Sequence, residues 1–188
     1  MEKQHQLDAL KADILANNVT PDLAAQATQL VMGHGNLNSE LFFIGEAPGK
    51  DEDLTGKPFQ GRAGQLLNEL LESVDIERDD VYVTNIVKYR PPKNRDPSRA
   101  EKDESWPYLE RELSIIQPKV ILTLGRHSMG HFLSDVTIGE AHGSLYDISV
   151  GGEQYTLAPL YHPSSTVYNK QTRQHFFDDL PKVLDQLK

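Results

Sequence analysis

The chain has 188 residues, of which 38% are hydrophobic and 25% charged, enough for one buried core but not for two full-sized domains. Its net charge of −9 argues against a general nucleic-acid binder, because neutralising phosphates requires clustered Lys and Arg. The chain contains no cysteine, which excludes disulfides, thiolate nucleophiles and iron–sulfur clusters held by Cys ligands.

The N-terminal part of the chain is predicted to be helical. Residues 7–16 and 22–31 fit a helical hairpin that is broken at Thr20-Pro21. The first residues are polar and lack the apolar region of a signal peptide, and no segment reaches the roughly 20 apolar residues that span a bilayer. We therefore expect a cytoplasmic protein without a membrane partner, and we also expect a monomer.

Four short, nearly continuous apolar runs follow, as expected of parallel strands that are buried on both faces. They cover residues 41–45, 81–87, 119–125 and 155–161. Helical patterns cover residues 61–74, 98–117, 125–133 and 176–187, and Trp106-Pro107 predicts a kink or a break in the second. The predicted fold is α/β, a three-layer α/β/α sandwich with a central, mainly parallel four-stranded sheet. We expect a single domain over residues 1–188, with residues 1–31 as an N-terminal helical segment.

Polar side chains follow the predicted strands at the point where each strand ends. They are Glu46, Asn85, Gly125-Arg126 and His162. Each alone fits a simpler interpretation, as a turn acid, a turn Asn or a loop His. Because ligands bind outside the carboxyl ends of parallel strands, all four could line one crevice. Phe59 supports this site, since a surface loop seldom exposes an aromatic ring without a lid or a stacked ligand.

Charged residues are unevenly distributed around this predicted crevice. Segment 88–102 contains six basic residues, the first of them Lys88 and the last Lys102, in a proline-rich loop that is either a solvated turn or a phosphate contact. The acidic residues 51–53 are either solvated or favour a helix N-terminus. Gly61 to Gly64, at a predicted helix start, leave open a phosphate-binding hydrolase of nucleotides. The missing GxxxxGK[ST] sequence argues against that alternative.

Four linked motifs give a more specific hypothesis. They are GEAPGKDEDLTGKPFQGRAGQLL, TNIVKYRPPKNRDP, VILTLGRHSMGHFL and HPSS. In this order and at these spacings, over about residues 31–187, the sequence resembles the family 4 type of uracil-DNA glycosylase. The resemblance implies an α/β/α fold and an enzyme that removes uracil from DNA in base-excision repair. Such an enzyme cleaves the N-glycosidic bond and leaves an abasic site. The chain lacks the KRRIH insertion of a covalently trapping branch, so we expect ordinary turnover.

The resemblance assigns the catalytic and substrate-binding residues. Glu46 and His162 are expected to be catalytic, with Glu46 stabilising an oxocarbenium-like transition state and orienting the water while His162 donates to the uracil O2. Phe59 is expected to stack on the base extruded from the duplex, and Asn85 to read its O4 and N3 edge. The remaining substrate-binding residues implied by the motifs are Gly45, Ala47 and Glu52.

The DNA-binding residues come from the same resemblance. Lys88 and Arg90 are expected to contact the DNA backbone. Ser164, Ser165 and Thr166 lie where the family inserts a loop into the duplex. Uracil-containing DNA is therefore the expected partner, and the alternative is a non-catalytic DNA-binding protein of the same fold.

The sequence departs from the family at one feature. Family 4 enzymes usually hold a [4Fe–4S] cluster on four cysteines, and this chain has Tyr89 and Ser105 at two of those positions. The other two would fall near Asn18 and Pro21. We therefore expect no cofactor and no metal, and we expect Tyr89 and Trp106 to pack in that region together with the N-terminal helices.

Overall fold

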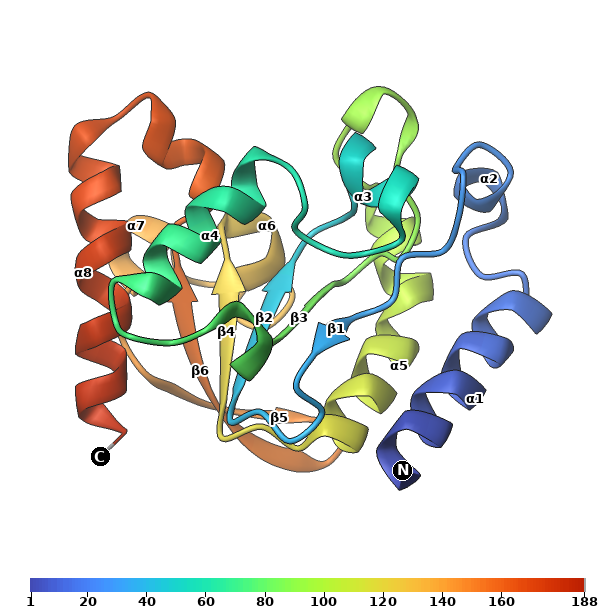
Figure 1. The fold of residues 1–188 in the computed structure, drawn as a ribbon, viewed down its shortest axis with the longest axis horizontal. Coiled ribbons are helices and arrows are strands. Elements are labelled where there is room, and N and C mark those ends of the chain that lie inside the picture. Colours follow the sequence, from blue (N-terminus) through green and yellow to red (C-terminus); the bar gives the residue numbers. More distant parts are fainter. Residues whose placement is uncertain (188) are drawn as a thin grey trace.

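The computed structural model describes residues 1–187, which form helices around one mixed β-sheet (Figure 1). The α-helices are α1 (Glu2–Ala16), α2 (Pro21–Ala24), α3 (Lys50–Thr55), α4 (Arg62–Glu72), α5 (Arg99–Ile116), α6 (Arg126–Met129), α7 (Ile138–Ala141) and α8 (Lys170–Gln186). The 3-10 helices are η1 (Arg78–Asp80), η2 (Pro92–Asn94) and η3 (Pro163–Val167). The strands are β1 (His34–Gly35), β2 (Leu41–Gly45), β3 (Tyr82–Asn85), β4 (Val120–Leu124), β5 (Tyr146–Val150) and β6 (Glu153–Leu160).

The sheet has the strand order β1-β3-β2-β4-β6-β5. The four predicted strands form its parallel centre, while β1 and β5 pair antiparallel at the two edges. The prediction of a mainly parallel, four-stranded sheet was therefore wrong, because the sheet has six strands and is mixed. β1 spans only two residues, and β5 alternates between covered and exposed positions instead of forming an apolar run.

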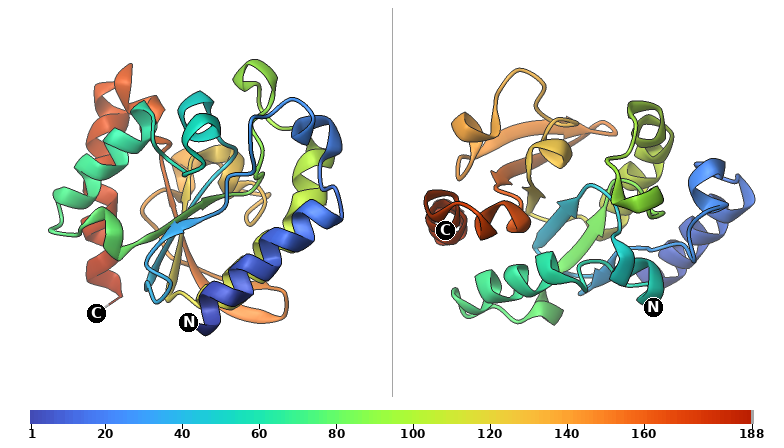
Figure 2. Two further views of the ribbon diagram at one scale, coloured as in Figure 1. Left: turned by 45° about the vertical axis from the view of Figure 1, so that its right-hand side comes forward. Right: turned by 90° about the horizontal axis from the view of Figure 1, so that it is seen from above.

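Helices cover both faces of the sheet, and the alternation of side chains along the strands explains this arrangement. Phe42 and Ile44 of β2 point into a core shared with α1, α2 and α5. Phe43, between them, points into a second core with α4 and α8. Figure 2 shows α1 beside α5 on one side of the sheet and α4 with α8 on the other. All three side chains are fully buried, which stabilises the fold by roughly 1.5–3 kcal/mol each.

Several helices differ from their predicted extents. α5 continues through Pro107, so the break expected at Trp106-Pro107 is not present, and the helix begins with a capping box formed by Ser98 and Glu101. Pro107 is exposed, so water can reach the carbonyl that loses its partner. α2 and α6 are shorter than expected, whereas α8 begins at Lys170 and continues through Pro181. No helix within residues 1–187 has both the length and the apolar character needed to cross a bilayer.

The four parallel strands end at the same edge of the sheet, which is the upper edge in Figure 1. The segment carrying α3 follows β2 there, the segment carrying η2 follows β3, α6 follows β4 and η3 follows β6. This edge therefore collects the strand ends on which the sequence predicts a site.

Candidate functional site

Gly45 makes room for two other predicted site residues. It ends β2 in register with Asn85 at the end of β3. A Cβ on Gly45 would lie 2.3 Å from Asn85 Oδ1 and 2.6 Å from Phe59 Cζ. The Asn85 amide and the Phe59 ring therefore meet over a glycine that leaves them space. Both are largely buried, at 3% and 7% exposure, so Phe59 is not the exposed ring that its loop suggested.

Glu52 fixes the loop that carries Phe59. Its Oε1 accepts hydrogen bonds from the backbone N–H groups of Gln60 and Gly61, at 2.9 and 3.1 Å, and its Oε2 accepts from Gly49 at 3.0 Å. Phe59 has φ 55°, a left-handed conformation that is costly for a residue with a side chain and needs such support. The Glu52 carboxylate, 8% exposed, thus braces the aromatic ring.

Glycines at the start of α4 serve the same loop. A Cβ on Gly64 would lie 1.9 Å from the carbonyl oxygen of Phe59, so only glycine permits this approach. The Gly61 N–H is already used by Glu52. Packing against Phe59 thus explains Gly64, and the Gly61 N–H has a partner within the protein, so neither glycine indicates a bound phosphate.

Glu46 follows Gly45 directly and lies near two basic side chains, Lys102, which the sequence placed in the basic loop, and His127, for which it predicted no role. Its side chain is 15% exposed, and Oε1 is buried without a hydrogen bond from the described residues. Lys102 Nζ lies 3.7 Å from that oxygen and His127 Nδ1 lies 3.8 Å from it. Burial raises the pKa of Glu46, while His127 and Lys102 oppose the shift. His127 lies on α6, three residues after β4 ends at Leu124, and this closeness to a strand end was the signal in the sequence.

His162 is held as a neutral hydrogen-bond donor. Its Nδ1 accepts the N–H of Ser164 at 3.1 Å, which requires that the ring proton be on Nε2. Burial, assisted by the nearby His127, lowers the pKa of His162 to about 4. Gly125, with φ 95°, permits the close approach, since a Cβ there would lie 2.8 Å from the His162 Cβ.

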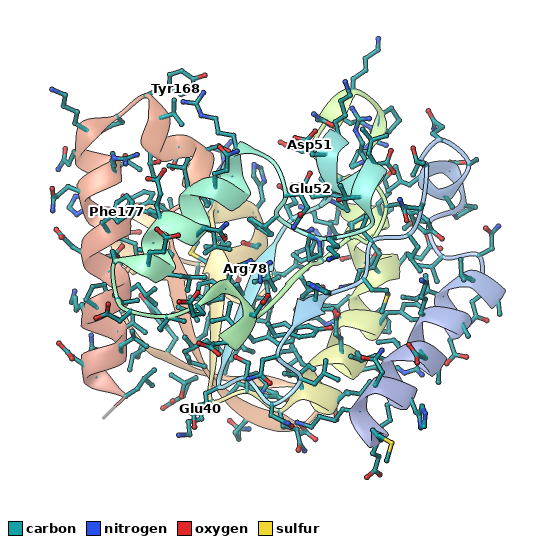
Figure 3. All side chains as sticks on the ribbon, viewed as in Figure 1. Glu40, Asp51, Glu52, Arg78, Tyr168 and Phe177 are labelled. Carbon is teal, nitrogen blue, oxygen red and sulfur yellow. The ribbon has the colours of Figure 1, made fainter. Side chains whose placement is uncertain are left out.

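These residues line one cleft of about 590 Å³. Seven of the predicted site residues contribute to its wall: Glu46, Ala47, Glu52, Phe59, Asn85, His162 and Ser164. Segment 91–97, after β3, also lines the cleft, through Pro91, Asn94, Arg95, Asp96 and Pro97. Figure 3 shows Glu52 and Asp51 at the same upper edge of the molecule as Tyr168, with Glu40 at the opposite edge.

The structure brings only part of the predicted DNA-binding set to the surface. Arg90 and the exposed Ser164 and Ser165 lie near the cleft, and Arg90 Nε donates to Asn94 Oδ1 at 2.6 Å. Lys88 is 3% exposed and paired with Glu112, so the expectation that it contacts the DNA backbone was wrong. Thr166 is 2% exposed, and its hydroxyl donates to the Pro163 carbonyl at 2.6 Å. Its side chain does not reach the surface either.

Two of the four positions that correspond to cluster cysteines, Tyr89 and Ser105, lie close together, but the residues there do not fit an iron–sulfur cluster. Tyr89 and Ser105 line a gap together with Val19, Thr20 and Tyr108. The gap is too narrow for a water molecule, and no residue of the chain can supply a thiolate. Tyr89 thus packs where it was expected. Trp106 instead lies outside this gap, stacked on His131 with ring centroids 5.1 Å apart.

Comparison with known proteins gives consistent matches. The sequence profile described as the uracil DNA glycosylase superfamily matches residues 32–187. The chain is similar to the Type-4 uracil-DNA glycosylase of Archaeoglobus fulgidus, with 41% identity over 86% of this chain and 84% of that protein. The Type-4 enzyme of Saccharolobus solfataricus is 42% identical over 84% of this chain and 76% of its own length. That of Thermotoga maritima is 39% identical over 86% and 84%.

Proposed function

The chain belongs to the uracil-DNA glycosylase superfamily, and from this premise we propose that it excises uracil from DNA and leaves an abasic site in base-excision repair. The observation that carries the proposal is the meeting of Glu46, Phe59, Asn85 and His162 in one cleft. The cleft has the size of a small-ligand site, at about 590 Å³, and it opens at the edge where parallel strands present ligands.

Recognition of the base would use Asn85 and Phe59. Uracil presents an N3–H donor beside an O4 acceptor, and the Asn85 amide can accept from the first and donate to the second. Cytosine reverses both groups, since its N3 accepts and its exocyclic amine donates. The Phe59 ring offers a stacking face to a base that has left the duplex, worth about 1–3 kcal/mol.

Departure of the base would rely on His162. As the N1–C1′ bond breaks, the electron pair stays with uracil, and negative charge develops on its O2. The Nε2–H of a neutral His162 can donate to that oxygen, and such a donor typically contributes a factor of 10² to 10³ in rate. The low pKa of His162 supports this neutral role, because the ring stays uncharged at neutral pH.

Attack by water would rely on Glu46. The cationic sugar that forms as the base leaves would be stabilised by the carboxylate of Glu46, which is only 15% exposed and therefore weakly screened by water. The oxygen of a water molecule bonds to C1′, and its proton passes to Glu46. The buried Oε1 without a hydrogen-bond partner supports this role, since it is free to accept from that water.

Docking to DNA would use the rim of the cleft. Arg90 is suited to phosphate contacts, which position the duplex without reading its sequence. The exposed Ser164 and Ser165 lie on the loop that would enter the duplex. The intact set of four cleft residues disfavours the alternative of a non-catalytic DNA-binding protein.

We further propose one domain that acts as a monomer in the cytoplasm and works without an iron–sulfur cluster. Sedimentation of the purified chain tests the monomer.

The test is excision from a single-uracil oligonucleotide, followed by alkali to cleave the abasic site. We expect strand cleavage at the uracil position and none in matched oligonucleotides with cytosine or thymine there. Glu46→Gln, purified in parallel, controls for contaminating host enzymes and is expected to lose most of the activity. A wild-type protein that binds DNA but leaves uracil in place would support the non-catalytic alternative.

A further inference from the structure

A buried ion pair lies directly beneath the base-reading end of β3. Lys88 is 3% exposed and Glu112, on α5, is fully buried. Lys88 Nζ donates to Glu112 Oε2 at 2.5 Å. The other oxygen of Glu112 accepts from the Tyr82 hydroxyl at 2.8 Å and from the Gly33 N–H at 3.1 Å. Both charged groups are therefore fully hydrogen-bonded inside the protein.

The ammonium group also reaches the backbone of Asn85. Lys88 Nζ donates to the Asn85 carbonyl at 2.7 Å and to Thr84 Oγ1 at 2.6 Å. The following residues return to β2, since the N–H of Ile86 donates to the Gly45 carbonyl at 3.0 Å. Lys88 thus holds the backbone of Asn85, the residue whose side chain extends into the cleft.

Stability alone does not account for this pair. Burying an ion pair removes its hydration. A protein in which apolar side chains of similar volume replace such a pair is often as stable or more stable. The position of the ammonium offers a different reason, because three acceptors fix it against the end of β3. A methyl group in its place would leave the Asn85 carbonyl without that donor.

We propose that Lys88 is a positioning residue that fixes the orientation of Asn85, with Glu112 holding Lys88 in place. The inference rests on the proposed function, because it concerns discrimination between uracil and cytosine in the same cleft. Lys88 touches no substrate and acts only through Asn85. Misplacement of a binding group by about 1 Å can cost on the order of 10² in rate.

The main test uses the neutral double variant Lys88→Met/Glu112→Gln, which removes both charges and leaves no unpaired buried ion. The maximal single-turnover rate on uracil is expected to fall about 10- to 100-fold, with a lower ratio of uracil to cytosine excision. Binding to uracil-free DNA is expected to stay unchanged. In an Asn85→Ala background the same double change is expected to have no further effect, because Lys88 acts only through Asn85.

A matched control is Lys119→Met/Glu40→Gln. It makes the same charge change in an exposed ion pair at the opposite edge of the molecule, and it is expected to change neither rate nor selectivity. Thr84→Val, which removes only the bridging hydroxyl, is a second variant if the main one does not fold. It is expected to lower selectivity in the same direction and to lose its effect in Asn85→Ala.

The outcomes distinguish a failure of this inference from a failure of the proposed function. An inactive wild-type protein would overturn the proposed function and this inference with it. An active wild type, combined with a folded variant of normal rate and selectivity, would overturn only the role of Lys88. Effects that multiply with those of Asn85→Ala would also overturn it, since they would mean that Lys88 acts elsewhere.

Discussion

Replacing Gly45 by Ala tests whether the cleft depends on the space that glycine leaves. The added methyl group would lie 2.3 Å from Asn85 Oδ1 and 2.6 Å from Phe59 Cζ. Ordinary contacts of a Cβ begin near 3.4 Å, so both groups must move by about 1 Å. The Gly45 backbone has no positive φ, so alanine adds no backbone strain and the effect comes from the contacts alone.

The expected effect on rate is large and that on stability moderate. A shift of about 1 Å in a binding group can cost on the order of 10² in rate, so single-turnover excision of uracil should fall by that factor. Overpacking a buried site costs about 1–3 kcal/mol, and each kcal/mol lowers the Tm of a chain of this length by about 2–4 °C. Rate and melting temperature are measured on the same preparation.

Gly139→Ala in α7 is the matched control, because the nearest atoms to its added methyl group are at 3.9 Å. It should leave rate and Tm nearly unchanged. A folded Gly45→Ala protein with the wild-type rate would contradict this prediction. In that case Asn85 and Phe59 would not need their observed positions for the reaction.

Three further predictions concern the same region. His162→Ala should lower the single-turnover rate about 10²- to 10³-fold without unfolding the protein, as monitored by circular dichroism, and full activity would remove His162 from the mechanism. Asn85→Asp should weaken uracil excision and shift preference toward cytosine, because a carboxylate accepts from the exocyclic amine and cannot donate to O4; an unchanged ratio would place base reading elsewhere. Tyr89→Ala should cost about 3–5 kcal/mol in denaturant unfolding, while the wild type should contain no iron and keep its activity after chelation. Stoichiometric iron would contradict this interpretation of the packed gap.

The centre of the fold could be predicted because its strands are buried on both faces. The run at 41–45 coincides with β2, and the runs at 81–87 and 119–125 contain β3 and β4. The run at 155–161 overlaps β6, which begins two residues earlier, at Glu153. Parallel strands end at a common edge, so the approach of Glu46, Asn85 and His162 followed from their positions alone. The resemblance to the family identified Phe59 as a site residue. The sequence pattern could not predict the conformation of the loop that carries it.

The edge strands carried weaker signals. β1 has two residues, too few for any periodicity. β5 and β6 are joined through Gly151 and Gly152, both with positive φ, which is a hairpin signal that the apolar-run criterion does not detect. α2 is a single short turn, whereas the sequence predicted a helix over residues 22–31. Apolar residues after Ala24 pack against the core without being helical.

The position of Lys88 could not be predicted from its neighbours. In sequence it begins a basic, proline-rich segment, which is typical of an exposed loop. Its partner Glu112 lies on α5, in the next helical segment, and only the packing of α5 on β3 brings the two together. Local composition predicts that Lys88 is solvated, because the carboxylate that pairs with it in the core is distant in sequence.

His127 links the ionisation of the two catalytic candidates. Burial favours the neutral form of both, raising the pKa of Glu46 and lowering that of His162. A positive charge on His127 lowers the pKa of both, and so favours the Glu46 carboxylate together with the neutral His162 ring. The reaction proposed above requires this combination.

His127→Gln tests this link. Glu46 is active as the carboxylate, so activity is present above its pKa and is lost as the pH falls through it. Without His127 the pKa of Glu46 should rise further, and the acid limb of kcat/KM should move to higher pH. His131→Gln removes a histidine that stacks on Trp106 and should leave that limb in place. If the limb disappears in Glu46→Gln but keeps its position in His127→Gln, then Lys102 alone balances the burial of the carboxylate.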